Sequence, residues 1–419
     1  MKTLDPEVDV VVLEAGLAGH GPSGRNGGFV STLWDDLPIL RDRVGDGDAV
    51  AVARASERGV RGIGAFCTEQ GVDAWFREAP TLYVATTESQ LGHWDDAIDA
   101  CRAVGAGDVI RPLTAQELQA RCDAGFLGGA EVALSATVQP ARLSLGLRQR
   151  ALDAGVRLHE RTTVTGLSPD GTATTSSGRV RAGAAVLAVN SATVGFPGFR
   201  LAHAVASSHM VVTEPVPDVI GELGWTGGEP IADGRTLLHY LRTTRDGRIA
   251  FGWGGGRMGF GARRSGRLEV DADVAQRTRD DLLRFFPALA GRKVTHAWGG
   301  PIDVSPTHLP IFGSRDRVHH GFGFTGNGVG PSYLGGEILA RLALDRRDEL
   351  TRLALVDPET KRMPPEPLRW AGGSLIRHAL VRKDAAEAGG RHVDPLTRAV
   401  VGLPRWLGLR LPRGGGASI

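Results

Sequence analysis

The segment from Val8 to Gly28, VDVVVLEAGLAGHGPSGRNGG, restricts the possible folds more than any other part of the chain. The β-branched run from Val8 to Leu13 predicts a buried parallel strand, and a glycine-rich stretch follows it. Gly19 to Gly24 also matches G-x-G-x-x-G, a pattern that binds a dinucleotide pyrophosphate at the start of a helix. The strand is therefore either the first or the second strand of a nucleotide-binding domain.

The residues around this segment favour the second strand. A first strand would lead directly into the glycines, with a helix at the third glycine and an acidic-ended strand about 20 residues later. Instead, Glu14 stands at the strand end, and the sequence RNGG from Arg25 to Gly28 is a poor helix start. A carboxylate at the tip of a second strand accepts ribose hydroxyl protons. We therefore interpret the Gly19–Gly24 match as a coincidence in a chain with 59 glycines among 419 residues.

The order of patterns along the chain predicts an α/β plus α+β fold class. Strands and helices alternate in the first part and again near the end, whereas residues 201–297 show the alternation typical of antiparallel strands. This arrangement predicts a discontinuous Rossmann-like nucleotide-binding domain with an inserted, mainly antiparallel substrate domain. We expect the nucleotide-binding domain at 1–75, 137–200 and 298–345, the substrate domain at 76–136 and 201–297, and a C-terminal extension at 346–419.

Composition excludes several other functions. Lys plus Arg number 49 against 47 Asp plus Glu, so the net charge of +2 gives no support to a nucleic-acid or membrane-surface role. The three cysteines match no metal or disulfide pattern, and we expect no metal site. Asp5, Glu7 and Asp9 interrupt any signal-peptide core, and no apolar run is long enough for a membrane helix. We therefore expect a cytoplasmic protein.

Four segments together carry a resemblance to a known family. They are VVVLEAGLAGHGPSGRNGG, ATVQPARLSLGLRQRALDAGV, AAVLAVNSAT, and HAWGGPIDVSPTHLPIFG followed by HHGFGFTGNGVGPSYLGGEILARLAL. In this order and spacing, the chain resembles the flavin-dependent amine and amino-acid oxidoreductases of the D-amino-acid oxidase type, which include glycine oxidase, sarcosine oxidase and γ-glutamylputrescine oxidoreductase. The resemblance covers nearly the whole chain, and the γ-glutamylputrescine oxidoreductase-like subgroup is the most similar.

The resemblance implies FAD as cofactor and hydride removal from a C–N bond of a small amine or amino acid to give an imine. It leaves the electron acceptor open. It assigns the ribose to Glu14, the adenine to the backbone of Val164, and the flavin ring to two loops. These loops comprise Arg25, Asn26, Gly27 and Gly28, and Gly326, Asn327, Gly328 and Val329. Attachment would be non-covalent, because Gly300 stands where covalent relatives carry a cysteine.

Three residues on the expected antiparallel strands are candidates for contacting the substrate. Tyr240 and Arg242 are two residues apart and therefore share one sheet face. There, Tyr240 could orient the amine and Arg242 could bind a carboxylate through two hydrogen bonds. His209 is the third candidate catalytic residue. His308 replaces an Asp that many relatives carry in the closing motif, and we interpret it as structural.

The family pattern also differs from this chain at one point. Relatives have a strand, G-x-G-x-x-G and a helix before the Glu-ended strand, whereas only MKTLDPE precedes Val8 here. We therefore expect no pyrophosphate-binding loop, an open slot in the sheet beside Val8–Leu13, and weak retention of FAD. Two alternatives remain: a truncated, flavin-deficient and inactive remnant of the family, and a nicotinamide-dependent dehydrogenase that uses Gly19–Gly24.

Overall fold

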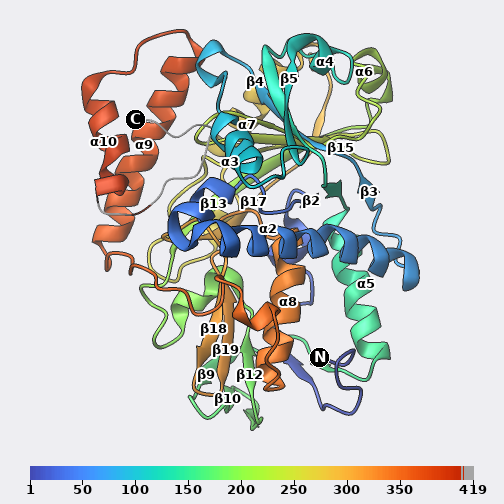
Figure 1. The fold of residues 1–419 in the computed structure, drawn as a ribbon, viewed down its shortest axis with the longest axis vertical. Helices are drawn as coiled ribbons and strands as arrows, with labels where there is room; N and C mark the ends of the chain where they lie inside the picture. Colours follow the sequence, from blue (N-terminus) through green and yellow to red (C-terminus); the bar gives the residue numbers. More distant parts are fainter. Residues whose placement is uncertain (407–408, 410–419) are drawn as a thin grey trace.

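The computed structural model describes residues 1–406 and 409, and a mixed eight-stranded sheet dominates it (Figure 1). Its strand order is β17-β13-β16-β15-β14-β4-β6-β5. These strands are β17 (Val294–Val304), β13 (Ala204–Thr213), β16 (Ile249–Trp253), β15 (His239–Thr243), β14 (Ile231–Asp233), β4 (Thr81–Ala85), β6 (Gly128–Val132) and β5 (Ile110–Thr114). Most neighbours are antiparallel, and β14 and β4 are parallel. The sheet thus joins strands from both segments expected to form the substrate domain.

Smaller sheets complete the fold, and those formed by β12, β18 and β19 and by β9, β10 and β11 lie at the other end of the molecule (Figure 1). One has the order β12-β19-β18, and a second pairs β1 with β8 in parallel. Two further sheets have the orders β11-β10-β9 and β2-β7-β3. Their bounds are β1 (Val11–Leu13), β8 (Arg157–His159), β12 (Ala185–Leu187), β18 (Ile311–Arg315), β19 (Val318–Phe322), β9 (Val164–Leu167), β10 (Ala173–Thr175), β11 (Gly178–Val180), β2 (Phe29–Val30), β3 (Arg77–Glu78) and β7 (Ala136–Thr137).

Two long helices connect the two ends. Helix α2 (Leu37–Glu69) crosses the molecule in Figure 1 and packs against α8 (Val329–Ala343). The sequence pattern predicts a helix from Tyr333 to Leu344, so α8 begins four residues earlier than predicted. A Cβ at Gly59 would lie 2.4 Å from the carbonyl oxygen of Gly330, so the two backbones touch at this crossing. The crossing fixes the N-terminus of α8. As the sequence indicates, α2 is interrupted at Gly45, whose φ is +78°.

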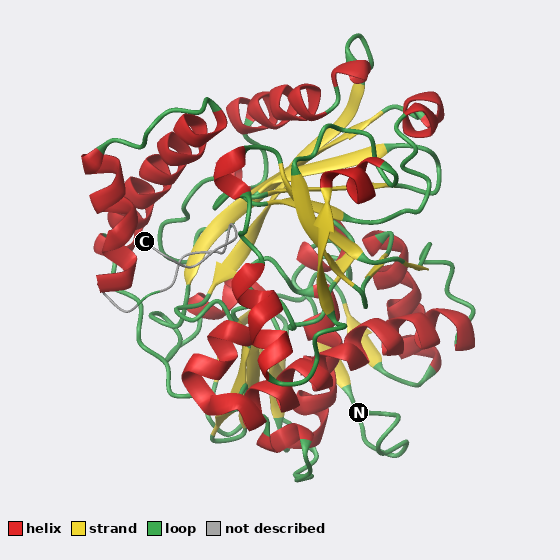
Figure 2. Cartoon of the chain, turned by 45° about the horizontal axis from the view of Figure 1, so that its top comes forward, coloured by secondary structure: helices red, strands yellow, loops and turns green. Residues whose placement is uncertain are grey.

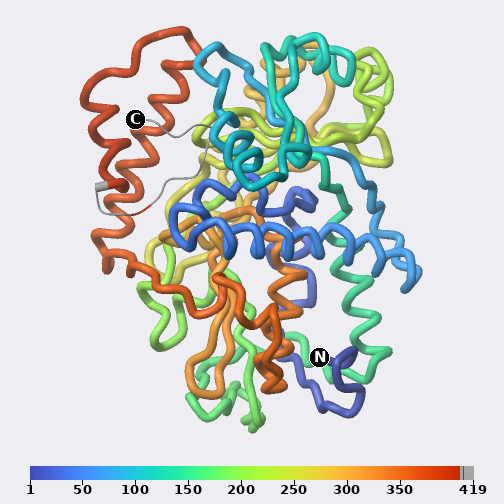
Figure 3. Tube along the Cα trace, viewed as in Figure 1, coloured from blue at the N-terminus to red at the C-terminus, as the bar shows by residue number. Residues whose placement is uncertain are grey.

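The remaining helices cover the sheets (Figure 2). They are α1 (Pro22–Arg25), α3 (Asp95–Ala103), α4 (Ala115–Gln119), α5 (Pro140–Asp153), α6 (Pro217–Glu222), α7 (Ala272–Phe285), α9 (Leu368–Ala388) and α10 (Pro395–Trp406). After α8 the chain returns from the smaller sheets to the side of the large sheet, where α9 and α10 lie together (Figure 3). Leu380 of α9 packs with Trp253 and Leu237 beside the large sheet. The part of the C-terminal extension that the structure describes, up to residue 406, therefore packs beside the large sheet.

Strand β1 is less buried than the sequence pattern predicts. None of its three residues is fully buried, and Val12 is 40% exposed. Among the described residues, β1 pairs with β8 alone and β12 with β19 alone, and Val186 in β12 is 38% exposed. The prediction of a buried strand is wrong because a parallel strand is buried only when strands and helices cover it on both sides. Each of the two strands has one edge without a ladder partner in the described chain.

The architecture confirms the predicted mixed class, with a nucleotide-binding-type α/β part and an antiparallel sheet part. The proposed domain boundaries remain a prediction. One of them, between 297 and 298, falls inside β17, whose residues from 294 to 304 pair continuously with β13 apart from one register shift.

Candidate functional site

A cavity of about 1260 Å³ extends from the end of β1 to the side of α9. Glu14 and Val164 line one part of it, and Arg25, Asn26 and Gly27 line another. The loop from Gly326 to Gly328 and the first residue of α8, Val329, line it as well. Tyr240 in β15 contributes to the same cavity, as the sequence analysis expects. Segments that are up to three hundred residues apart therefore face one enclosed space.

Glu14 lies at the end of β1 with part of its carboxylate available. Its backbone N–H donates to the carbonyl oxygen of His159 at 2.9 Å, which extends the β1–β8 pairing by one residue. Its Oε1 accepts a hydrogen bond from the N–H of Gly16 at 2.7 Å. This bond fixes the side chain at the cavity wall, and a carboxylate has lone pairs for further donors such as ribose hydroxyls.

The Arg25–Gly28 loop is held in shape from several sides. The indole of Trp298 donates to the carbonyl oxygen of Arg25 at 2.8 Å, and the Arg25 guanidinium pairs with Glu269 at 2.8 Å. Asn26 Oδ1 accepts from the N–H of Gly28 at 2.7 Å, which closes a tight turn. Pro22–Arg25 forms one helical turn where the sequence analysis expected only loop.

Gly27 and Gly28 each require glycine, but for different structural reasons. A Cβ at Gly27 would lie 3.0 Å from Cε2 of Tyr240, so the loop backbone comes close to that ring at the cavity wall. Gly28 has φ +78°, and a Cβ there would lie 2.1 Å from the carbonyl oxygen of Val138. Gly28 therefore serves the backbone turn and its packing, and it is not among the described residues that line the cavity.

Asp303, at the end of β17, organises the loop that precedes α8. Its Oδ2 accepts from the N–H of Gly323 at 2.5 Å, and its Oδ1 accepts from Asn190 Nδ2 at 3.1 Å. Its backbone oxygen accepts from the N–H of Thr325 at 3.0 Å. Complete burial raises the pKa of Asp303 to about 6, although these hydrogen bonds act to lower it. The sequence analysis did not identify this residue, although it lies inside the quoted closing motif.

Tyr240 presents a hydroxyl to the cavity wall beside Ser208. Its Oη lies 2.7 Å from Ser208 Oγ, and Ser208 Oγ donates to the carbonyl oxygen of Trp253 at 3.0 Å. Because the Ser208 proton is directed to that carbonyl, the Tyr240 proton is directed to Ser208, and the lone pairs of Oη remain able to accept. Burial raises the pKa of Tyr240 to about 12, so the phenol is neutral.

The structure does not bring Arg242 and His209 to the cavity with Tyr240. Arg242 is 6% exposed, and its Nε donates to the carbonyl oxygen of Gly27 at 2.6 Å, so the Arg25–Gly28 loop lies over it. In β13 the even-numbered residues Ser208 and Met210 line the cavity, and strand alternation directs His209 to the other face. Arg242 and His209 are not among the described residues that line the cavity.

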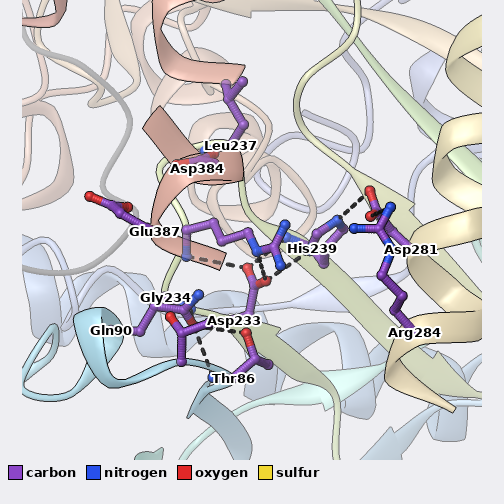
Figure 4. A network of polar contacts seen from close by, with 12 residues as sticks. Thr86, Gln90, Asp233, Gly234, Leu237, His239, Asp281, Arg284, Asp384 and Glu387 are labelled. Atoms are coloured by element: carbon purple, nitrogen blue, oxygen red, sulfur yellow. Dashed lines mark hydrogen bonds and ion pairs between the residues drawn. The ribbon is translucent and has the colours of Figure 1, made fainter. Parts of the chain in front are cut away.

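A buried ionic network lies along the same sheet (Figure 4). His239 Nδ1 lies 2.7 Å from Asp233 Oδ2, and its Nε2 lies 3.1 Å from Asp281 Oδ2 in α7. Burial acts to lower the pKa of His239, but the charge of Asp233 and the hydrogen bonds to both carboxylates raise it overall. Asp233 also lines the cavity, so the network supports its wall from behind. The sequence offers no local signal for it, because its members are far apart in the chain.

Gly19–Gly24 does not have the context of a dinucleotide fingerprint. The helix at this stretch is the four-residue α1, which begins within it at Pro22, and the next strand is the two-residue β2 in an antiparallel sheet. A Cβ at Gly24 would lie 2.0 Å from the carbonyl oxygen of Gly19, so these glycines serve a compact turn. A pyrophosphate loop needs a strand, a crossover helix and a second parallel strand.

The structure thus brings an acidic strand end and two glycine-containing loops to one cavity. The chain belongs to the FAD dependent oxidoreductase family (DAO), whose model matches residues 4–342. This match confirms the resemblance identified from the four sequence segments, and it confirms FAD as the cofactor.

The relatives agree in fold and extent. A probable oxidoreductase OrdL from Rhizobium meliloti is 26% identical over 389 residues, which cover 89% of this chain and 84% of that protein. Gamma-glutamylputrescine oxidoreductase from Escherichia coli is 26% identical over 345 residues, covering 80% and 78%. L-proline dehydrogenase from P. horikoshii is similar in structure, with a TM-score of 0.66, 17% identity and coverage of 83% and 89%. The last similarity shows the fold alone.

The described residues contain no group of three or more His, Cys, Asp or Glu side chains that could hold a metal ion. None of the helices in the described part of the chain is long and apolar enough to cross a membrane.

Proposed function

We propose that this protein oxidises a C–N bond of an amine or amino acid to an imine, with FAD as the hydride acceptor. The observation that carries the proposal is the shared cavity. Both expected flavin loops and the Tyr240–Ser208 wall line it, and Glu14 lies in the same cavity. The name of the gamma-glutamylputrescine relative and the proline dehydrogenase fold are consistent with a small amine or amino-acid substrate.

The residues that line the cavity fit the cofactor except at the pyrophosphate. Glu14 would bind the ribose, Val164 would contact the adenine through its backbone, and Arg25–Gly28 and Gly326–Val329 would flank the flavin ring. The N-terminus of the 15-residue helix α8 directs partial positive charge toward the Gly326–Val329 end of the cavity. When bound, FAD supplies the redox chemistry, and the protein supplies binding and orientation.

Tyr240 would orient the substrate amine. Its oxygen accepts a hydrogen bond while its own proton is held by Ser208, so it favours an N–H that points at the wall. Arg242 would act as a positioning residue, because its contact with the Gly27 carbonyl holds the flavin loop against the sheet. His209 would support β13 from the opposite face, where its ring packs close to Gly299.

A flavin-deficient form of this chain is a second candidate state, and the open edges of β1 and β12 favour it. A strand between them would complete the sheet and bring a loop to the pyrophosphate position. A nicotinamide-dependent reaction through Gly19–Gly24 is disfavoured by the short α1.

The test is to purify the 419-residue chain, supply excess FAD, and follow anaerobic bleaching of the visible flavin band with amines and amino acids. We expect bleaching with at least one of them, and ammonia or an amine together with a carbonyl product. Tyr240→Phe should weaken substrate binding and leave the flavin spectrum unchanged. Flavin that binds but is bleached by no compound of either class would contradict the proposal.

A further inference from the structure

One face of α9 lines the cavity, and neither the family match nor the expected flavin contacts gives it a role. Gly372, Gly373, Ile376, Arg377 and Leu380 belong to this face. Residues spaced by four in a helix lie on the same side, so a single stripe of α9 is directed at the cavity. The family model ends at residue 342, before this helix begins.

Two glycines leave part of this stripe of α9 without side chains. A Cβ at Gly372 would meet no described atom within 4 Å beyond its own helix. A Cβ at Gly373 would lie 2.7 Å from Cε of Met258, so the helix backbone itself approaches the loop after β16. The cavity therefore extends up to the helix backbone, next to the side chain one turn further along, Arg377.

Arg377 is oriented by backbone carbonyls and has no acidic partner. Its Nε and Nη2 donate to the carbonyl oxygen of Gly255 at 3.0 and 2.7 Å, and Nε also donates to that of Gly256. Among the described residues, no carboxylate lies within ion-pair distance of its guanidinium, and Nη1 has no hydrogen-bond partner. The neighbouring Arg257, by contrast, pairs with Asp271 and Asp273.

The surroundings of Arg377 favour an anion. Burial, followed by the charges of Arg257 and Arg277, lowers the pKa of Arg377 to about 10, and the residue remains a cation at neutral pH. The guanidinium of Arg377 is partly desolvated and already held in one orientation. A guanidinium in this state recognises a carboxylate through paired hydrogen bonds.

We propose that Arg377 binds a carboxylate of the substrate, distant from the oxidised amine, at the α9 end of the cavity. The inference rests on the proposed function and names its substrate class as amines with a distal acidic group. Ser208 links Tyr240 to the carbonyl of Trp253, and Gly255 follows two residues later. Tyr240 and Arg377 also line the same cavity, which gives one elongated substrate access to both side chains.

The first experiment measures binding without turnover. Glutarate and its uncharged counterpart glutaramide are titrated by calorimetry into the full chain with excess FAD, for the wild type, R377Q and R377K. We expect glutarate to bind and R377Q to bind it at least about tenfold more weakly, because a charge-assisted carboxylate contact is lost. R377K should fall between, and R382Q, on the same helix but 72% exposed, should match the wild type.

The second experiment varies the chain length of the substrate and the free space in the cavity beside Gly372. Within the series β-alanine, 4-aminobutyrate, 5-aminovalerate and 6-aminohexanoate, one length should give the lowest KM, and R377Q should raise that KM while leaving n-butylamine unaffected. G372L should exclude the longer members while the protein still folds, because its side chain enters open space.

The two proposals fail in different ways. Arg377-dependent glutarate binding without oxidation of any amine would refute the proposed function and leave the anion site standing. Amine oxidation with equal glutarate affinity in the wild type and R377Q would refute the anion site.

Discussion

Replacing His239 with leucine should destabilise the large sheet, because it leaves two buried carboxylates without their shared partner. Asp233 and Asp281 are each 2% exposed. Breaking a buried ion pair on one side costs about 3–5 kcal/mol. Each carboxylate keeps at least one arginine, since Arg235 lies 3.2 Å from Asp233, and Arg284 and Arg277 lie 2.9 and 3.7 Å from Asp281. We therefore expect a loss at the lower end, about 3 kcal/mol.

Thermal unfolding followed by tryptophan fluorescence measures this loss. For a unit of 150–250 residues, about 3 kcal/mol corresponds to a decrease in Tm of roughly 6–12 °C. Because the folded state raises the pKa of His239, its stabilising contribution is complete below the ordinary value of 6.5. The contribution is lost as the pH rises through the raised pKa. The difference between the wild type and H239L should therefore be largest in mildly acidic buffer and decrease at alkaline pH.

Two control variants test the reasoning. His296 lies exposed on β17 of the same sheet, and H296L should change Tm by little, as surface substitutions do. Adding D233N and D281N to H239L removes the uncompensated charges and should recover part of the loss. An unchanged Tm for H239L in mildly acidic buffer, or a difference that grows with pH, would show that the imidazolium does not hold these carboxylates.

The other predictions concern the cofactor end of the cavity. The pKa of Asp303, raised from 3.8 to about 6, means that its protonated form favours folding. About 3 kcal/mol should therefore be lost as the pH rises from 4 through 6, and urea titrations of D303N should lack this slope. G28A should lower both stability and FAD affinity because of the positive φ and the Val138 carbonyl, whereas G221A, at an open position in α6 that does not line the cavity, should be neutral or stabilising. The 419-residue chain should lose FAD on desalting, because β1 and β12 have open edges. Stoichiometric FAD that remains bound after desalting would contradict this expectation and would favour Gly19–Gly24 as the pyrophosphate loop.

Local signals in the sequence predicted local structure correctly. The Thr114–Glu117 spacing predicts a capping box, and both of its bonds form. Pro140 and Gly155 are helix start and end signals, and α5 begins at Pro140, with Gly155 in the left-handed region after its end. These features need only a few neighbouring residues, so short-range sterics and hydrogen bonds decide them. The two-residue spacing of Tyr240 and Arg242 predicted a shared sheet face, and in the structure both residues contact the backbone at Gly27.

Tertiary packing overrode the local pattern at other positions. The glycines at the start of α8 suggested a loop. The structure instead forms a helix there, because the backbone of α8 lies so close to Gly59 of α2 that the contact leaves no room for side chains. The apolar run at Val8–Leu13 suggested burial, but burial depends on neighbours that come from elsewhere in the chain. Arg242 was expected at the substrate, but the loop that it holds covers it.

By itself, the sequence determined the fold class, the family and its cofactor, and most cavity-lining loop residues, because these depend on ordered local motifs. Only the tertiary structure showed which side chains face the cavity. It joined His239 with Asp233 and Asp281, directed His209 away, and brought Arg377 to the same space as Tyr240. The reason is physical: each of these placements depends on contacts between residues far apart in sequence, and on which neighbour covers which face.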